Sequence, residues 1–326
     1  MTAPSRAAPI ALTCGEPAGI GPELAVAAHE LLAQTVPFFL LGDAKHLPDG
    51  AAFVTIADPA EAVDAMAHGL PVLQHDFGSP RVPGQPQPDQ AAHVVTVIEN
   101  AVRLVQSGAA SAICTLPIHK QALAEGAGFG FPGHTEFLCH LAGAQEVVMM
   151  LASDQLRVVP ITIHIALDEV AGSLTPALLE TRLRITHQAM VAQFGIPAPR
   201  IAVAGLNPHA GEGGRMGREE IEIIAPVLER LRREGMDLRG PMSADTMFHA
   251  AARTGYDVAV AMYHDQALIP IKTLDFDRGV NVTLGLPFVR TSPDHGTAFD
   301  IAGKGRANPT STVEALRLAA RLSGWL

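Results

Sequence analysis

The chain has 326 residues, of which 48% are hydrophobic and 17% are charged. This length and composition predict a folded protein of about two domains and exclude a chain that is disordered throughout. The formal net charge of −10 at pH 7 argues against a general nucleic-acid-binding surface. No segment approaches the roughly 18 consecutive apolar residues of a membrane-spanning helix, so we expect neither nucleic acid nor a membrane as a partner.

The N-terminus and the cysteines predict a cytoplasmic location. The apolar stretch from Ala7 to Thr13 is too short for the core of a signal peptide. Cys14, Cys114 and Cys139 are an odd number without a CxxC pair, which fits a reducing compartment.

Strand-like and helix-like segments alternate along the chain, and this alternation favours an α/β fold with mainly parallel strands. In the N-terminal part we predict strands at 9–14, 37–43, 51–57 and 110–117, helices from about residue 23 and at 91–106, and an exposed connection at 75–90. In the remainder we predict a hairpin-like pair of runs at 146–152 and 157–164, strands at 200–205 and 257–263, and helices at 175–194, 217–234, 243–253 and from about 312.

The segment GFGFPG (128–133) satisfies the G-x-G-x-x-G pattern of dinucleotide-binding Rossmann folds, but its context is wrong. That motif should follow a strand and open a helix. Here KQALAEGA precedes it and a proline interrupts it. We therefore expect a plain loop, with any nicotinamide site built differently.

Three histidines lie where apolar, strand-like runs end: His164, His209 and His264. The carboxyl ends of strands in an open parallel sheet line one crevice, where ligands bind. Three imidazoles at that edge can hold a divalent metal and leave one coordination position open, as catalytic zinc sites do. Asp265, directly after His264, is a candidate for orienting such a ligand.

A second group of residues suits an anionic substrate. His134 and Thr135, which we expect on a loop, offer an imidazole and a hydroxyl donor for a phosphate or carboxylate. Lys272, Asn281 and Arg290 can complete an anion pocket, because the arginine fork matches phosphate oxygens and lysine supplies a point charge. On position alone, Lys272 and Asp245 are candidates for proton transfer.

The segment DHGTAFDIAGKGRANP (294–309) is the most specific string in the chain. Backbone amides of a loop such as HGTA can contact an adenine edge, and the Asp300 carboxylate can accept from a ribose hydroxyl. This string resembles the adenosine-binding loop of the isocitrate and isopropylmalate dehydrogenases, which bind NAD without a Rossmann fingerprint.

Nearly the whole chain resembles the 4-hydroxythreonine-4-phosphate dehydrogenase family of pyridoxine biosynthesis. The matching segments occur in family order and comprise GEPAGIGPE, PIHK, PGHTEF, LNPHAGEGG, MYHDQ, RGVNVTLGLPF and RTSPDHGTA. Two positions depart from the usual family pattern, Leu116 before PIHK and Ala267 after MYHDQ, and neither is a candidate ligand.

The resemblance implies an isocitrate dehydrogenase-like fold of two α/β domains with mainly parallel sheets, divided as 1–115 plus 285–326 and 116–284. It implies a homodimer whose active sites are shared between subunits. It places NAD or NADP on the 294–309 loop and one divalent metal, Zn, Mg or Co, on the three histidines. The expected residues are His295, Gly296, Thr297, Asp300 and Asn308 for the cofactor, His164, His209 and His264 for the metal, and His134, Thr135, Lys272, Asn281 and Arg290 for the substrate.

The implied reaction is NAD(P)-dependent oxidation of 4-phosphooxy-L-threonine at its C3 hydroxyl, followed by loss of the carboxylate. Two alternatives remain open on the sequence. One is a related dehydrogenase of another phosphorylated or dicarboxylic hydroxy acid, such as a phosphothreonate, a phosphoerythronate or a dihydrodiol. The other is a metal-dependent hydrolase or acyl-phosphate-handling protein that uses no nicotinamide.

Overall fold

The computed structural model describes residues 8–326, which divide into two compact units. Unit 1 comprises the residues up to 145 together with 286–326, and unit 2 comprises 146–285. The sequence-based boundary at 115/116 differs from this division, because residues 116–145 belong to unit 1. The physical reason is that the two helices of this segment, α4 (Lys120–Ala127) and α5 (His134–Ala142), pack on helix α3 (Ala91–Gln106) of the same unit.

The sheet of unit 1 is parallel throughout, with strand order β3-β4-β2-β1-β5-β12. Its central strands are buried on both faces, which is why they read in the sequence as short continuous apolar runs. The strands are β1 (Ile10–Thr13), β2 (Phe38–Gly42), β3 (Phe53–Ile56), β4 (Leu70–Gln74), β5 (Ala112–Thr115) and β12 (Val289–Pro293).

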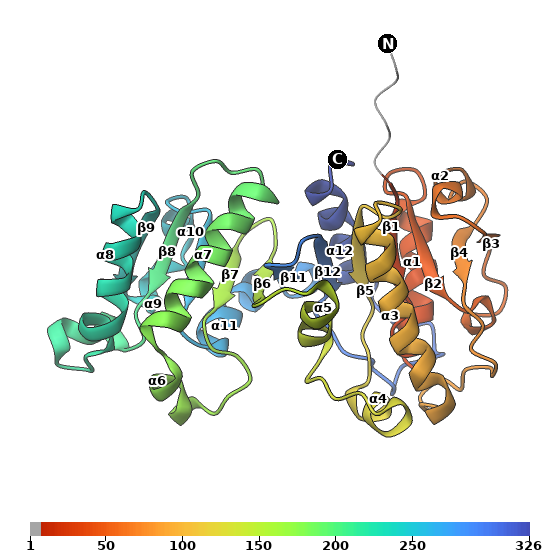
Figure 1. Ribbon diagram of the computed structural model, residues 1–326, viewed down its shortest axis with the longest axis horizontal. Helices are drawn as coiled ribbons and strands as arrows, with labels where there is room; N and C mark the ends of the chain where they lie inside the picture. The colour runs from red at the N-terminus through yellow and green to blue at the C-terminus, as the bar shows by residue number, and fades with distance from the viewer. Residues whose placement is uncertain (1–7) are drawn as a thin grey trace, which may run out of the picture. The chain divides into compact units, whose positions relative to one another are not determined.

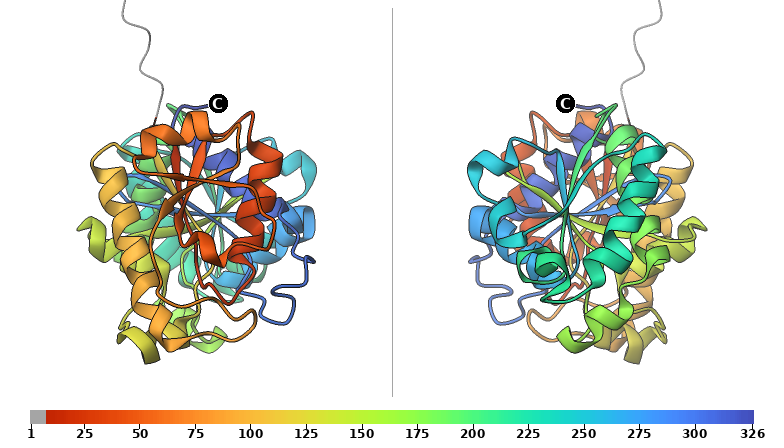
Figure 2. Two further views of the ribbon diagram at one scale, coloured as in Figure 1. Left: turned by 90° about the vertical axis from the view of Figure 1, so that its right-hand side faces the viewer. Right: turned by 90° about the vertical axis from the view of Figure 1, so that its left-hand side faces the viewer.

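Helices cover both faces of this sheet (Figure 2, left). Helix α3 spans the predicted residues 91–106 and packs on β1 and β5, while α1 and α12 pack together on the other face. The buried residues of α3 recur every three or four positions, as an amphipathic helix requires. The helices are α1 (Gly21–Leu32), α2 (Ala62–Ala65), α3 (Ala91–Gln106), α4 (Lys120–Ala127), α5 (His134–Ala142) and α12 (Thr310–Leu322), with short 3-10 turns at Ala44–His46, Pro59–Glu61 and Pro88–Gln90.

The sheet of unit 2 has the order β11-β6-β7-β10-β8-β9. Strand β6 runs antiparallel to both β11 and β7, and the other pairs are parallel. The antiparallel β6–β7 pair confirms the predicted hairpin-like arrangement. The strands are β6 (Val148–Ala152), β7 (Arg157–Pro160), β8 (Arg200–Ala204), β9 (Asp237–Met242), β10 (Val258–Ala261) and β11 (Val280–Leu284).

In unit 2, α7 and α8 lie on one face of the sheet and α11 on the other (Figure 2, right). Two helix predictions need correction. The helix predicted at 217–234 starts with a π-helical turn at Glu220–Ile224, and that predicted at 243–253 breaks in two because His249 has an extended backbone. The helices are α6 (Val170–Ser173), α7 (Pro176–Ala192), α8 (Ala225–Arg233), α9 (Ala244–Met247), α10 (Ala250–Arg253) and α11 (His264–Asp275), with 3-10 turns at Leu167–Glu169, Pro208–Gly214 and Phe276–Arg278.

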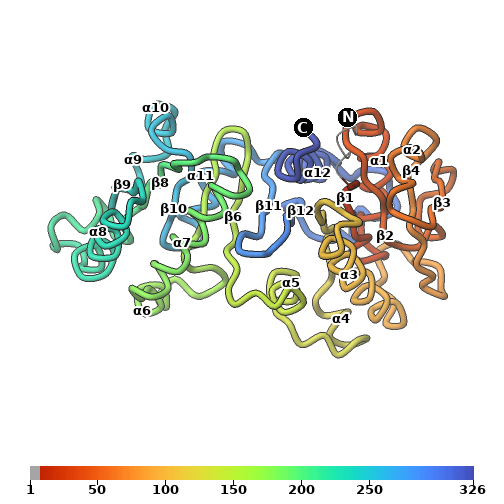
Figure 3. Tube along the Cα trace, turned by 45° about the horizontal axis from the view of Figure 1, so that its top comes forward, coloured from red at the N-terminus to blue at the C-terminus, as the bar shows by residue number. Residues whose placement is uncertain are grey.

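The structure confirms an α/β protein with mainly parallel sheets (Figure 1). The chain builds unit 1 as far as α5, forms unit 2, and returns to unit 1 through β12 and α12, so that its last helix packs against its first (Figure 3). The segment 128–133 connects α4 to α5 and follows no strand, as predicted. Within residues 8–326, no helix is long and apolar enough to cross a membrane.

Candidate functional site

Arg290, one of the predicted contacts of an anionic substrate, is buried. Arg290 lies in β12 and is 3% exposed, and its Nη2 donates a hydrogen bond of 2.6 Å to Oγ1 of Thr115 at the end of the neighbouring strand β5. Burial lowers the pKa of Arg290 to about 10, so the guanidinium still carries its charge at neutral pH. A buried guanidinium with its planar fork of N–H donors suits a site for an anionic ligand.

His134 and Thr135 are the first two residues of helix α5, and our expectation of a loop is therefore wrong. Gly133, with a fully extended backbone, ends the preceding loop, and the helix starts after it. His134 is half-buried, but its Nε2 is inaccessible to solvent and has no hydrogen-bond partner among the described residues. Burial, with the positive charges of Arg290 and Lys120, holds its pKa well below the ordinary histidine value.

A further cation, Lys120, lies close to the start of α5, because a Cβ on Gly133 would be 3.4 Å from Cε of Lys120. Lys120 is exposed at the first position of α4, directly after the helix-capping His119. We had quoted it as the last letter of the PIHK motif without giving it a role. Only the approach of α4 to α5 in the folded chain makes it a candidate anion contact.

In unit 2, His164 and His264 come together. Their ring centroids are 5.8 Å apart, and both line a cavity of about 500 Å³ beside Thr162, Tyr263 and Ile269. Nδ1 of His264 forms a hydrogen bond of 2.7 Å with Oδ1 of the adjacent Asp265. This bond occupies one ring nitrogen and leaves Nε2 for a ligand, the geometry expected of a carboxylate that orients a metal-binding histidine.

His209 is not part of this pair. It lies in the turn Pro208–Gly214 after β8, where six consecutive residues from His209 onward have positive φ. In residues 8–326, no three His, Cys, Asp or Glu side chains are arranged to hold a metal ion. One chain therefore presents two neighbouring imidazoles, His164 and His264, and a third that lies apart from them.

The remaining predicted residues of unit 2 lie on three different elements. Lys272 is in the last turn of α11, with its Nζ 5.8 Å from the centre of the Phe276 ring. Asn281 is in β11, where its Oδ1 is buried without a hydrogen-bond partner in the described chain. The exposed Asp245 carboxylate in α9 accepts a hydrogen bond of 2.6 Å from the Ser243 hydroxyl.

The predicted cofactor residues lie on the loop between β12 and α12. Burial lowers the pKa of His295, whose Nδ1 is 3.1 Å from the carbonyl oxygen of Gly296, and Asp300 is exposed. Thr297 contributes its backbone carbonyl to a hydrogen bond with Ile20. Asn308 has a local role in the structure, because its Oδ1 accepts from the backbone and hydroxyl of Thr310 where α12 begins.

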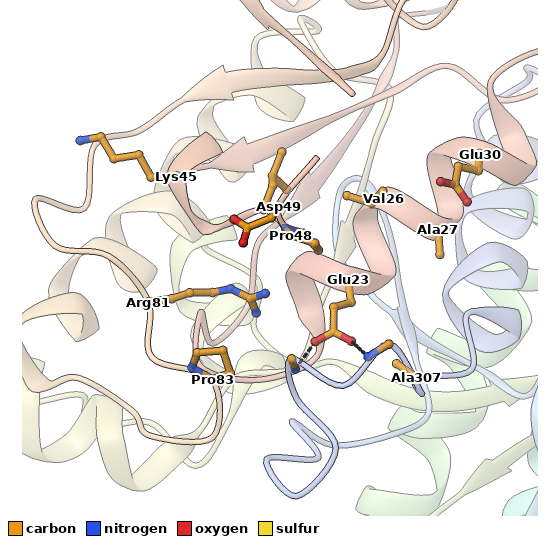
Figure 4. A pocket seen from close by; sticks show the side chains of 13 residues that line it. Glu23, Val26, Ala27, Glu30, Lys45, Pro48, Asp49, Arg81, Pro83 and Ala307 are labelled. Atoms are coloured by element: carbon orange, nitrogen blue, oxygen red, sulfur yellow. Dashed lines mark hydrogen bonds between the residues drawn. The ribbon is translucent and has the colours of Figure 1, made fainter. Parts of the chain in front are cut away.

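A cavity of about 680 Å³ adjoins this loop (Figure 4). Gly303, Gly305 and Ala307 form one wall and helix α1 another, with Glu23 between them. None of the five predicted cofactor residues is among the described residues that line it. Glu23 is the last residue of the GEPAGIGPE segment, and the sequence alone gives no sign that it lines a cavity.

These features gain their context from known proteins. The family described as "Pyridoxal phosphate biosynthetic protein PdxA" matches residues 26–319 of the chain. The chain belongs to the PdxA family. A 4-hydroxythreonine-4-phosphate dehydrogenase of Roseobacter denitrificans is 63% identical over 317 residues, which are 97% of each protein. The resemblance inferred from the motifs is thereby confirmed, as is the expectation of a dehydrogenase-type enzyme.

Two solved structures cover nearly the whole chain. The 4-hydroxythreonine-4-phosphate dehydrogenase of Klebsiella pneumoniae superposes with a TM-score of 0.89 at 39% identity, over 98% of this chain and 99% of that one. A terephthalate 1,2-cis-dihydrodiol dehydrogenase of Burkholderia xenovorans superposes with a TM-score of 0.68 at 30% identity, over 97% and 98%. Proteins that share this fold are thus named for the oxidation of different substrates.

Proposed function

We propose that the protein oxidises 4-hydroxythreonine 4-phosphate (4-phosphooxy-L-threonine) with NAD or NADP in the biosynthesis of pyridoxal phosphate. The product, 2-amino-3-oxo-4-phosphooxybutanoate, would lose its carboxylate to give 3-amino-2-oxopropyl phosphate. The observations that carry the proposal are the buried, charged Arg290 and the buried Nε2 of His134, which has no hydrogen-bond partner among the described residues. Both groups suit contacts to a phosphate. The close relatives of that name support the same substrate.

Arg290, His134 and Thr135 are proposed to hold the phosphate. Arg290 is positioned by its bond to Thr115, and the fork of N–H donors of a guanidinium matches the oxygens of a phosphate. His134 stays neutral at physiological pH because of its lowered pKa, and a neutral imidazole can donate its Nε2 proton to a phosphate oxygen. Lys120 is a further candidate contact, and Lys272 and Asn281 are proposed to bind the remainder of the substrate.

His164, His209 and His264 are proposed to hold one divalent metal, with Asp265 orienting His264. The donor set fits, because imidazole nitrogens suit Zn²⁺, although Co²⁺ or Mg²⁺ remain candidates. A metal held there would polarise the C3 oxygen of the substrate in both its alcohol and ketone forms. Since only two of these imidazoles are neighbours within one chain, we propose a homodimer in which the partner subunit supplies the third.

Lys272 and Asp245 are the proposed proton-transfer groups, the first in the last turn of α11 and the second in α9. The hydride from C3 would pass to the nicotinamide of a cofactor bound at His295, Gly296, Thr297, Asp300 and Asn308. We propose a cytoplasmic location because Cys14 and Cys114 are buried free thiols, as expected in a reducing compartment.

The test is a turnover assay with 4-hydroxythreonine 4-phosphate and NAD⁺ or NADP⁺, followed by the absorbance of the reduced cofactor, with and without a chelator. We expect turnover that the chelator abolishes and that added Zn²⁺, Co²⁺ or Mg²⁺ restores. Absence of turnover with every metal and both cofactors would refute the proposal.

A second candidate is a dehydrogenase of another anionic diol or hydroxy acid, favoured by the dihydrodiol dehydrogenase among the structural neighbours. The same absorbance assay distinguishes it if the panel includes a phosphothreonate, a phosphoerythronate and an aromatic cis-dihydrodiol carboxylate. Preference for one of these by kcat/KM would replace the proposed substrate. A calorimetric titration that detects no NAD(P) binding would instead favour a metal-dependent hydrolase.

A further inference from the structure

The carboxylate of Glu23 bridges two backbone amides of the distant 294–309 loop. One of its oxygens accepts from the N–H of Gly303 and the other from the N–H of Gly305 at 3.2 Å, across about 280 residues of sequence (Figure 4). Glu23 is half-buried in the first turn of α1, and its carboxylate is directed at the loop that carries Ala307 (Figure 4).

The loop has a backbone conformation that depends on such a support. Gly303 and Gly305 have φ values of 75° and 62°, in the left-handed region that other residues rarely adopt. A Cβ on Gly303 would lie only 2.9 Å from Cβ of Pro83, so the loop passes close to the 75–90 connection. Glycine gives this segment little rigidity of its own, so fixed acceptors for its N–H groups restrict the conformations open to it.

The turn that leads into Glu23 contacts the same loop a second time. The N–H of Ile20 donates to the carbonyl oxygen of Thr297 at 3.0 Å, and a Cβ on Gly19 would lie 2.8 Å from that oxygen. The segment from Thr297 to Gly305 is thus held at both ends. The turn before α1 binds Thr297 at one end, and the Glu23 carboxylate binds Gly303 and Gly305 at the other.

Arg81 joins this arrangement from the 75–90 connection. Its Nη1 donates to the carbonyl oxygen of Gly19 at 3.4 Å, and Figure 4 shows its guanidinium on the side of the cavity that faces Glu23. Burial lowers the pKa of Arg81, and the negative charges of Glu23 and Asp49 oppose that effect. The charge of Glu23 is therefore balanced by backbone amides and a nearby cation.

We propose that Glu23 is a positioning residue of the nicotinamide-cofactor site, which holds the 297–305 loop in the conformation that binds the dinucleotide. This inference rests on the proposed function, in which that loop receives NAD or NADP. Glu23 itself need not touch the cofactor, since it acts through Gly303 and Gly305.

The test compares Glu23→Ala and Glu23→Gln with the matched control Glu30→Gln. Glu30 lies on the same helix and lines the same cavity, but no hydrogen bond joins its carboxylate to the glycines in the described chain. The readouts are amide hydrogen exchange in a peptide that spans 301–307, the Kd for NADH from fluorescence titration, and the KM of the phosphorylated substrate.

Loss of two charge-assisted hydrogen bonds should accelerate exchange and raise the Kd for NADH roughly tenfold or more in Glu23→Ala, and less in Glu23→Gln. The KM for the phosphorylated substrate should stay within about twofold, because the Glu23 carboxylate bonds to the backbone of Gly303 and Gly305, which are not among the proposed substrate contacts. Glu30→Gln should match the wild type in all three measurements. If Glu23→Ala does not fold, Glu23→Gln and Glu23→Asp provide the same comparison.

Unchanged exchange, or faster exchange with an unchanged Kd for NADH, would overturn the positioning role. An equal rise in the KM of the phosphorylated substrate would also overturn it, because it would indicate general damage. Failure of the wild-type protein to bind NADH is a different outcome, which would remove the proposed function and this inference together.

Discussion

Two buried polar groups illustrate how single residues set the chemistry of the anion pocket. Arg290 is almost completely inaccessible, and Nε2 of His134 is buried without a hydrogen-bond partner within residues 8–326. A buried polar atom such as this Nε2 is costly unless a further group, for example a ligand, completes its hydrogen bonds. The sequence provides these residues, but only their burial distinguishes them from surface side chains.

Replacement of Arg290 by alanine should weaken binding of the phosphorylated substrate far more than binding of the cofactor. A lost charge-assisted contact costs on the order of 2–3 kcal/mol, which corresponds to a rise in KM of tens-fold to over a hundredfold. Steady-state kinetics with each reactant varied in turn would measure this, and Arg290→Lys, which keeps the charge but loses the fork, should be intermediate. An unchanged KM for the phosphorylated substrate would remove Arg290 from the site.

The lowered pKa of His134 predicts that acid destabilises the protein. The unfolded chain binds a proton at this residue near the ordinary pKa of about 6.5, whereas the native state binds it only at lower pH. Below about pH 6.5 the free energy of unfolding should therefore fall, by at most about 1.4 kcal/mol per pH unit for this one group. His46 and His295, whose pKa values are also lowered, act in the same direction.

Urea unfolding at several pH values between about 5 and 8 would measure this slope. His134→Asn should reduce the slope without removing it, because the other histidines remain. If the free energy of unfolding changes with pH in the same way in the variant and the wild type, His134 has the same pKa in the folded and unfolded states, which would contradict the prediction.

At the scale of elements, the turn Pro208–Gly214 is the most unusual segment, with a run of residues at positive φ. It is attached to the π-helical turn through Glu220, which is 4% exposed and accepts from the backbone N–H and the side-chain amide of Asn207. The position of His209 therefore depends on a buried carboxylate from the next element.

Gly211 and Gly213 offer a matched pair for testing this turn. Both have positive φ, but a Cβ on Gly211 would lie 2.6 Å from Oε2 of Glu220, whereas one on Gly213 would meet nothing within 4 Å. We expect Gly213→Ala to cost roughly 1–2 kcal/mol of unfolding free energy from backbone strain alone. Gly211→Ala should cost more and also weaken metal binding, as measured by urea unfolding and by metal content. Equal costs for the two variants would argue against the contact with Glu220.

At the scale of the whole molecule, the metal proposal predicts that subunits complement each other. His209→Ala and His264→Ala homodimers should each lack bound metal and turnover while remaining folded. If a site takes these two histidines from different chains, a mixed dimer of the two variants has one complete site and should recover up to about half of the wild-type activity.

Subunit mixing after mild dissociation, with heterodimers isolated through two affinity tags, provides the measurement. Verified heterodimers without any activity or bound metal would indicate that each metal site takes both His209 and His264 from a single chain. An active monomer in sedimentation experiments would contradict the shared site altogether.

Local patterns and motifs in the sequence were sufficient to predict the fold class, the family and many element bounds. Helix 91–106 was predicted residue for residue, because its apolar periodicity is a local property. The short buried strands were recognisable as apolar runs, whereas the helix that starts at His134 was mistaken for a loop. Its glycine-rich lead-in resembles a turn, and its stability comes from packing on α3, which local sequence does not reveal.

Which candidate residues lie close together depends on the folding of the whole chain. The fold brought His164 to His264, placed Arg290 beside Thr115, and joined Glu23 to Gly303 across about 280 residues. The fold also assigns residues 116–145 to unit 1, whereas the sequence-based boundary had placed them in the second domain. Periodicity and composition report interactions between residues a few positions apart, whereas these contacts depend on strand order and on the burial of whole elements. The sequence could therefore supply the chemical groups of the site, but their pairing and protonation are properties of the folded chain.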